Sequence, residues 1–176
     1  GVMLSSGMAD YAELYGVRAG EQIVIATTGD SAYDDARLLA AAGATVTVVD
    51  TRGGALPGGS RAQQAQGDKV TVLRGFVPVL AKGSARVSAL IVRQMEGGKA
   101  SGETRELACD AIGMAGGWNP AIHLYSHSGG KAQWDEHLVC FKPGPVMPDQ
   151  ICVGACNATW SLGSSLDEGS LAGAAA

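Results

Sequence analysis

Short apolar runs alternate with polar and glycine-rich segments along most of the chain. The runs at 22–26 and 45–49 are rich in β-branched residues, as strands covered on both faces of a parallel sheet are. Between them, Ala32, Ala36 and Leu39 recur at helical spacing. The pattern predicts a strand, a tight turn, a helix and a second parallel strand, which together form a βαβ unit.

Further elements are expected on both sides of this unit. Apolar residues at helical spacing predict an opening helix within 1–15, capped by Ser5 or Ser6 and stopped by Gly16. The other expected elements are a helix capped by Ser60, strands over 70–73 and 110–115, and an antiparallel meander over 75–109. The predicted class is α/β, a Rossmann-like nucleotide-binding domain with an antiparallel meander.

The last third of the chain has a different pattern. Residues 121–150 are loop-rich, and a strand over 151–157 is followed by a helix. Because one strand and one helix cannot fold alone, partner strands are expected elsewhere in a longer protein. We therefore predict an inserted nucleotide-binding domain over 1–120, and over 121–176 a connection and the C-terminal strand and helix of an outer nucleotide-binding domain.

Composition narrows the possible classes of protein. The net charge of the 176 residues is −4 and the basic residues are scattered, which argues against nucleic acid as a partner. The sequence contains no apolar run of membrane-spanning length and no secretory signal pattern, so a soluble, cytoplasmic protein is expected. The first residue is not Met, which suggests that the chain begins inside a longer protein.

Neither the cysteines nor the histidines form a recognisable reactive or metal-binding motif. The four cysteines contain no CxxC pair, and buried free thiols are expected. A metal site could be drawn through His123, His127 and His137, but no dependable fourth ligand is near them in the sequence. We predict no metal site and no catalytic residue in this chain.

The turn after the first strand of the βαβ unit resembles a dinucleotide fingerprint. That fingerprint needs a tight turn, a glycine where the backbone approaches the diphosphate, and a small residue where helix meets strand. Thr27, Gly29 and Ala32 occupy these places, so the first glycine is missing. The backbone N–H groups at the start of the helix could bind a phosphate.

An acidic residue ends the second strand of the unit. Asp50 lies 21 residues after Gly29, where a carboxylate can accept hydrogen bonds from the ribose of NAD and repel the 2′-phosphate of NADP. The guanidinium of Arg52, two residues later, could instead bind a phosphate. The alternative interpretation is that Asp50 only ends a strand and Asp30 only caps a helix. We predict NAD as the preferred nucleotide.

Several motifs together resemble a known family. The turn Thr28-Gly29-Asp30-Ser31-Ala32 is similar to that of thioredoxin-reductase-like flavoproteins. The whole set resembles the α subunit of heterotetrameric sarcosine oxidase. Its members are Gly1-Val2-Met3-Leu4-Ser5-Ser6, Asp30-Ser31-Ala32-Tyr33, Gly116-Gly117-Trp118-Asn119-Pro120, His123-Leu124, Ser128-Gly129-Gly130-Lys131, Trp134-Asp135 and Gly154-Ala155-Cys156-Asn157.

The resemblance implies that the inserted domain over 1–120 is a Rossmann-like FAD/NAD(P)-binding domain that binds NAD, that the outer domain is of the FAD/NAD type, and that the chain has a cofactor-binding role within a larger enzyme. That enzyme oxidatively demethylates sarcosine to glycine, passes the one-carbon unit to tetrahydrofolate and makes hydrogen peroxide, with FAD and FMN elsewhere in the complex and NAD on the α subunit. The implied partners are the β, γ and δ subunits, and the isolated chain is expected to be inactive. The implied cofactor-binding residues are Thr27, Thr28, Gly29, Asp30, Ser31, Ala32, Asp50, Arg52, Gly116, Gly117, Trp118, Gly154, Ala155, Cys156 and Asn157.

Three alternatives stay open at this point. The chain could come from a related dehydrogenase of opines, proline or glycine, or it could be a structural module with a vestigial nucleotide site. A disulfide reductase of the thioredoxin-reductase type is disfavoured, because that enzyme needs a CxxC pair in this domain.

Overall fold

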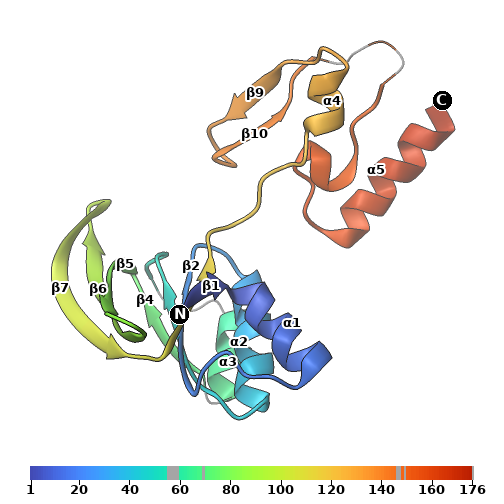
Figure 1. The fold of residues 1–176 in the computed structure, drawn as a ribbon. Coiled ribbons are helices and arrows are strands. Elements are labelled where there is room, and N and C mark those ends of the chain that lie inside the picture. The colour runs from blue at the N-terminus through green and yellow to red at the C-terminus, as the bar shows by residue number, and fades with distance from the viewer. Residues whose placement is uncertain (55–59, 69, 146–147, 149, 176) are drawn as a thin grey trace. The chain divides into compact units, whose positions relative to one another are not determined.

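The computed structural model describes residues 1–54, 60–68, 70–145, 148 and 150–175. They form two compact units, Gly1–Gly117 and Trp118–Ala176 (Figure 1). No helix among these residues is long and apolar enough to cross a membrane. The cytoplasmic location stays a prediction.

The first unit is built on a five-stranded parallel sheet with the strand order β1-β8-β2-β3-β4. Its strands are β1 (Val2–Leu4), β2 (Gln22–Thr27), β3 (Thr45–Asp50), β4 (Thr71–Arg74) and β8 (Ala111–Ala115). In the register of the sheet, Thr27 pairs with Asp50 on one side and with Ala115 on the other. The carboxyl ends of three neighbouring strands therefore meet at one edge of the sheet.

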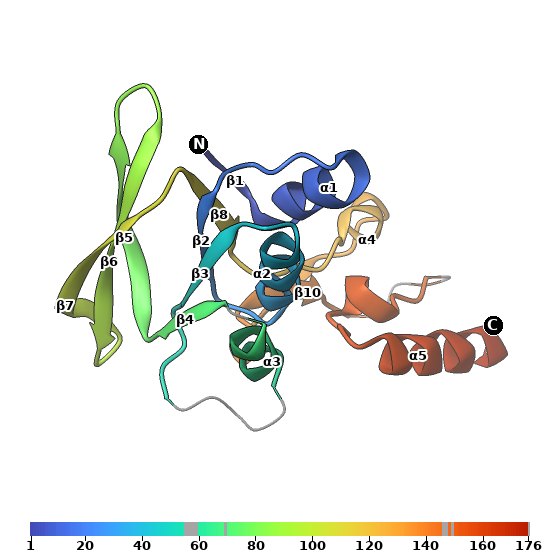
Figure 2. The ribbon, with the colours of Figure 1, turned by 90° about the horizontal axis from the view of Figure 1, so that it is seen from below.

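Helices cover one face of this sheet and a meander covers the other (Figures 1 and 2). The helices are α1 (Ser5–Tyr15), α2 (Ser31–Ala41) and α3 (Arg61–Gly67), and the meander consists of β5 (Phe76–Gly83), β6 (Val87–Glu96) and β7 (Lys99–Ala108). Successive side chains of a strand point to opposite faces. Accordingly, Ile23 and Ile25 pack in one buried cluster with Tyr33 of α2, whereas Val24 packs in another with Phe76.

Most of the predicted elements of this unit are confirmed. The βαβ unit, the third strand, the meander and the last strand all form. The Ser60 hydroxyl accepts a hydrogen bond from the Gln63 N–H at 3.3 Å, which is the predicted cap of α3. Gly16 ends α1 in the left-handed conformation with φ 64°.

The start of the chain differs from the prediction. The cap by Ser5 or Ser6 is wrong, because Leu4 is the N-cap residue and the Ser5 hydroxyl donates to Asp35 Oδ2 at 2.6 Å instead. Val2–Leu4 forms an unpredicted strand beside β8. Its three residues are too few to show a strand period, and Leu4 also fits the helical pattern that follows.

The second unit contains more regular structure than was predicted. The segment expected to be a connection holds α4 (His123–His127) and a hairpin of β9 (Ala132–Asp135) and β10 (Cys140–Pro143). Residues 146, 147 and 149 of that segment lie outside the described residues. The predicted final helix is confirmed as α5 (Leu162–Ala175), in which no side chain is buried.

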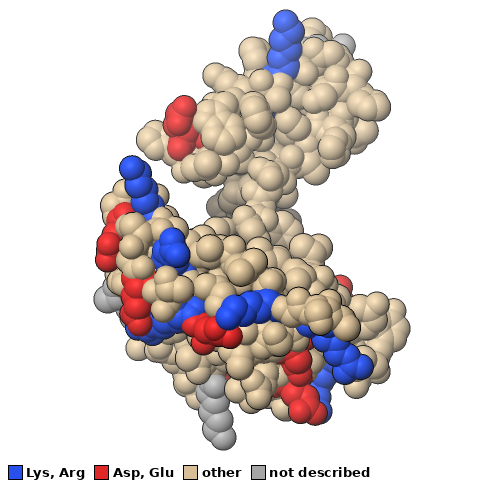
Figure 3. Space-filling model, turned by 60° about the vertical axis from the view of Figure 1, so that its left-hand side comes forward, with Lys and Arg blue, Asp and Glu red and all other residues tan. Residues whose placement is uncertain are grey.

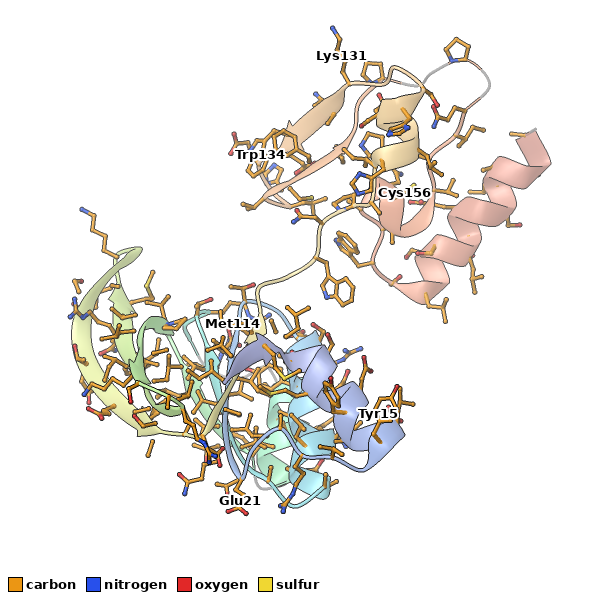
Figure 4. All side chains as sticks on the ribbon, viewed as in Figure 1. Tyr15, Glu21, Met114, Lys131, Trp134 and Cys156 are labelled. Atoms are coloured by element: carbon orange, nitrogen blue, oxygen red, sulfur yellow. The ribbon has the colours of Figure 1, made fainter. Side chains whose placement is uncertain are left out.

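The strand predicted over 151–157 is wrong. Residues 151–153 carry no regular structure, and Gly154–Asn157 forms a short 3₁₀ helix, η1. Figure 4 shows Cys156 on this turn of helix. Gly154 has φ +67°, and its N–H donates to Glu168 Oε2 at 2.7 Å, so the backbone turns toward α5. An apolar run signals burial, but a strand also needs a neighbouring strand to bond to.

Candidate functional site

The predicted residues of the first unit gather where three strands end. Thr28 to Asp30 follow β2, Thr51 and Arg52 follow β3, and Gly116 and Gly117 follow β8. A Cβ atom on Gly117 would lie 3.4 Å from Thr28 Oγ1, so the loops after β8 and β2 are in contact. Met114, near the end of β8, marks this edge of the sheet in Figure 4. In open α/β sheets, ligands bind at this carboxyl edge.

Thr27 holds the turn closed through its side chain. It is buried, and its hydroxyl accepts a hydrogen bond from the Gly29 N–H at 3.0 Å. The same hydroxyl lies 2.9 Å from the Gly29 carbonyl oxygen and 3.2 Å from that of Ala115, and it can donate to either. The side chain thus fixes a turn that a first glycine forms in the usual fingerprint.

The next positions of the turn match the fingerprint more closely. A Cβ atom on Gly29 would meet no atom within 4 Å, so the space in front of this residue is open. Ser31 begins α2, and Ala32 is fully buried where the helix packs on the sheet. The open space and the close helix contact are the two features that a diphosphate at a helix N-terminus requires.

Asp50 does not face solvent. Its exposed fraction is 0%. Tyr33 Oη donates to Oδ2 at 2.7 Å, and Arg52 donates from its backbone N–H at 2.9 Å and its Nε at 3.0 Å to Oδ1, and from Nη2 at 2.9 Å to Oδ2. Arg74 Nε lies 3.6 Å from Oδ2. The carboxylate is therefore engaged by protein groups on both oxygens.

The pKa values follow from these contacts. Burial by itself would raise the pKa of Asp50, but the hydrogen bonds from Arg52 and Tyr33 outweigh it and hold the pKa below its ordinary value. Burial and the hydrogen bond to Asp50 raise the pKa of the Tyr33 hydroxyl. The hydrogen bond to Asp50 raises the pKa of Arg52. Asp50 and Arg52 are thus an ion pair and Tyr33 is a neutral donor at neutral pH.

Arg52 links the buried carboxylate to the exposed surface. Its side chain is 40% exposed, and Nη2 also donates to Asp30 Oδ1 at 2.6 Å. Asp30 itself is 59% exposed and makes no side-chain hydrogen bond to the helix backbone. Asp30 thus occupies the N-cap position of α2, as the alternative expected, but its side chain does not cap the helix, and its carboxylate pairs with Arg52 in the loop after β3 instead.

Two contributors to this network were not predicted from the sequence. Tyr33 lies on α2 and Arg74 ends β4, and both reach Asp50 from elsewhere in the chain. A fully buried tyrosine hydroxyl needs a hydrogen-bond partner, which is the one signal that could have suggested a polar group beneath α2. The pairing of β3 with β4 places Arg74 opposite Asp50.

The remaining predicted residues lie in the second unit. Trp118 begins it and is 70% exposed. Glu168 of α5 accepts hydrogen bonds from Gly154 and Thr159, and the bond from Thr159 lowers the Glu168 pKa most. The Cys156 thiol donates to the Val153 carbonyl at 3.3 Å. Asn157 lines a cavity of about 350 Å³ together with Tyr125 and Gln150.

The distribution of charged side chains and potential metal ligands among the described residues bears on whether a second cluster exists. On the face drawn in Figure 3, basic and acidic side chains are intermixed and do not form a stripe of one sign. In the described part of the chain, no three His, Cys, Asp or Glu side chains gather as a metal ion would need. Of the four thiols, Cys109 and Cys140 are buried as expected, while Cys152 and Cys156 are partly exposed.

The fold is shared with solved flavoprotein reductases. Thioredoxin reductase from Lactococcus lactis superposes with a TM-score of 0.70 at 21% identity, over 98% of this chain and 55% of that one. The flavoprotein disulfide reductase RclA from Escherichia coli superposes with a TM-score of 0.61 at 16% identity, over 86% of this chain and 34% of that one. These identities establish the fold alone.

Curated sequences are much closer, although no family model matches the chain. Sarcosine oxidase subunit alpha from Corynebacterium sp. strain P-1 is 39% identical over 178 residues, covering 100% of this chain and 18% of that protein. The subunit from Rhizobium meliloti strain 1021 is 36% identical over 171 residues, covering 96% of this chain and 16% of that protein. The chain spans less than a fifth of the length of these relatives. Over essentially its whole length the chain matches one segment of sarcosine oxidase subunit alpha, and that segment has a FAD/NAD(P)-binding Rossmann-type fold.

Proposed function

We propose that the first unit binds a dinucleotide, with NAD as the preferred ligand, at the carboxyl edge of its sheet. The diphosphate would lie against Gly29 and the backbone N–H groups that open α2. Residues Thr27 and Thr28 and the glycines at 116 and 117 would line the turn. The ribose would lie near Arg52, two residues after Asp50, the residue that the sequence predicts as the NAD-specifying acid.

One observation carries this proposal. The register pairs Thr27 with both Asp50 and Ala115, so the loops after β2, β3 and β8 converge in front of an open Gly29. Convergence of these loops at the point where a nucleotide-binding sheet holds its ligand supports binding more strongly than the incomplete fingerprint does.

We also propose a place for the chain in a larger enzyme. In that enzyme sarcosine is demethylated to glycine, with hydrogen peroxide and methylene-tetrahydrofolate as further products, and the amine-oxidising FAD and the FMN are held outside this segment. Residues 1–120 would form an inserted domain, and residues 121–176 would belong to an outer domain whose dinucleotide meets Gly154–Asn157. The β, γ and δ subunits would be its partners. The names of the relatives support an enzyme of this kind.

A second candidate is a structural module whose nucleotide site is vestigial. It is favoured by the side-chain closure of the turn at Thr27 and by the burial of Asp50. A protein of this kind would keep the fold and the network around Asp50 but bind no nucleotide.

Calorimetric titration of the 176-residue chain with NAD and NADP distinguishes the two candidates. Binding is expected to be saturable and tighter for NAD. The absence of heat with either nucleotide, in a protein shown to be folded by circular dichroism, would contradict the proposed binding and favour the structural module.

A further inference from the structure

The predicted role of Asp50 does not fit its environment, and this raises the question of what selects the nucleotide. A ribose cannot contact a carboxylate that is 0% exposed and bonded on both oxygens. Among the described charged side chains of this network, the most exposed are the Arg52 guanidinium at 40% and the Asp30 carboxylate at 59%, which are joined at 2.6 Å. This ion pair is therefore the part of the network that a bound nucleotide could contact.

Asp50 holds the Arg52 side chain in a fixed orientation. Its Nε and Nη2 atoms both donate to Asp50, a two-point contact that fixes the plane of the guanidinium. A fixed, partly exposed guanidinium two residues beyond the second strand of the βαβ unit is where a Rossmann domain receives the 2′-phosphate of NADP. By position alone, Arg52 would favour the phosphorylated nucleotide.

Asp30 opposes that preference. Its carboxylate occupies Nη2 of Arg52 and adds a negative charge at the start of α2. Asp30, Asp50, Arg52 and Arg74 together carry no net charge, because two carboxylates face two guanidinium groups. A phosphate dianion would have to displace Asp30 from Arg52 and lie beside its carboxylate, whereas a ribose diol would not.

We infer that the Asp30–Arg52 ion pair determines the nucleotide preference of this turn: Asp30 neutralises Arg52 and makes the site select a dinucleotide with an unphosphorylated ribose. The inference rests on the proposed dinucleotide binding. It assigns the preference for NAD to Asp30 in place of Asp50, and it makes Arg52 a latent receptor for a ribose phosphate.

The substitution Asp30→Asn tests this assignment, with Asp34→Asn as the matched control. Asp34 lies on the same helix and pairs with Arg61 at 2.6 Å, with both side chains about half exposed, so the control removes an equivalent charge and ion pair. Binding of NADH and NADPH to the 176-residue chain is followed by the fluorescence of the reduced nucleotide. Asp30→Asn is expected to tighten NADPH binding roughly tenfold relative to NADH binding, the effect of one charge-assisted hydrogen bond gained by a phosphate.

The control should leave the ratio of the two dissociation constants unchanged, and the double variant Asp30→Asn with Arg52→Gln should lose the gain for NADPH. Competition with 2′-AMP and with 5′-AMP identifies which phosphate is recognised. Asp30→Asn should tighten the binding of 2′-AMP and leave that of 5′-AMP unchanged. If the NADPH to NADH ratio of Asp30→Asn stays at the wild-type value while both nucleotides bind, the inference is wrong and the proposed function stands. If neither nucleotide binds to the wild type or to the variant, the proposed function at this turn fails and the inference fails with it.

Discussion

Asp50 ties three elements together at the carboxyl edge of the sheet. Its carboxylate accepts hydrogen bonds from Tyr33 of α2 and from Arg52 in the loop after β3, and it lies beside Arg74 of β4. A buried carboxylate in such surroundings stabilises the fold only while all its partners are in place. We therefore assign Asp50 an architectural role that positions Arg52.

We predict that Asp50→Asn strongly destabilises the first unit. The substitution removes the charge that compensates Arg52 and leaves a buried amide among donors, so the free energy of unfolding should fall by about 2–4 kcal/mol. Urea unfolding followed by far-UV circular dichroism measures this change. Asp68→Asn is the matched control, because the Arg37–Asp68 pair is 40% and 48% exposed and should contribute less than about 1 kcal/mol.

The same carboxylate should make stability depend on acid pH. The folded-state pKa of Asp50 is lowered, so its contribution is fully present above the unfolded-state pKa of about 3.9 and is lost as pH falls through the folded-state pKa. Wild type should therefore lose more stability than Asp50→Asn as the pH is lowered from about 5. Asp135, whose pKa is lowered to about 2 by Lys142, titrates in both proteins and cancels in the comparison. If the difference in free energy of unfolding between wild type and Asp50→Asn stays constant down to pH 3, this role of Asp50 is contradicted.

The sequence predicted where Asp50 and Arg52 lie better than it predicted which side chains contact them. It located Asp50 and Arg52 by their distance from the turn, and the structure places both at the predicted edge. It could not reveal that Tyr33 and Arg74 fill the surroundings of the carboxylate, because those contacts depend on how α2 and β4 pack on β3. Spacing along the chain does not determine burial.

At the scale of elements, two glycines at neighbouring strands should behave in opposite ways. A Cβ atom on Gly113 of β8 would lie 3.1 Å from Ile25 Cγ1 and 3.3 Å from Ser5 Cβ, so Gly113→Ala should cost about 1–3 kcal/mol of stability. Gly29→Ala meets no atom, and its stability should stay within about 0.5 kcal/mol of wild type. Urea unfolding compares the two variants.

The same pair of variants separates packing from binding. Gly29→Ala should weaken NAD binding roughly tenfold or more, because the methyl group enters the space proposed for the diphosphate. Unchanged NAD affinity in a Gly29→Ala protein of wild-type stability would show that the diphosphate does not lie against this residue.

Elements with a strong period were predicted well, and those that depend on distant partners were not. The βαβ unit and the meander each show their pattern within one segment. The strand Val2–Leu4 needs β8, more than 100 residues later, to form its hydrogen bonds. On the hairpin of β9 and β10, the exposed rings of Trp134 and Phe141 meet edge to face, with 5.1 Å between their centroids. The hairpin therefore lacks the alternation of apolar and polar residues that marks a half-buried strand. Figure 4 shows Trp134 on this hairpin.

At the scale of the whole molecule, the two units differ in their cores. Two clusters of buried side chains lie on the two faces of the sheet of the first unit. In the described part of the second unit, the buried apolar side chains are those of Pro120, Tyr125, Cys140 and Ala158, and α5 buries none of its side chains. Hydrophobic burial scales with the apolar area removed from water, so the second unit should be the less stable one.

The tryptophans allow this difference to be measured. All three, Trp118, Trp134 and Trp160, lie in the second unit, whereas backbone structure lies in both. We predict that the urea transition seen by tryptophan fluorescence has a lower midpoint than the main transition seen by far-UV circular dichroism. Coincident transitions by the two probes would indicate that the units unfold together and would contradict the prediction.

The proposed function places a dinucleotide against the turn from Thr27 to Ala32. Hydrogen exchange of the 176-residue chain with and without saturating NAD, read by mass spectrometry of peptides, tests it most directly. Slower exchange is expected in the peptide that covers residues 27–33, with no change in β5–β7 or α5. Saturable NAD binding that leaves this peptide unchanged and protects only residues 150–160 would place the nucleotide elsewhere and contradict the claim.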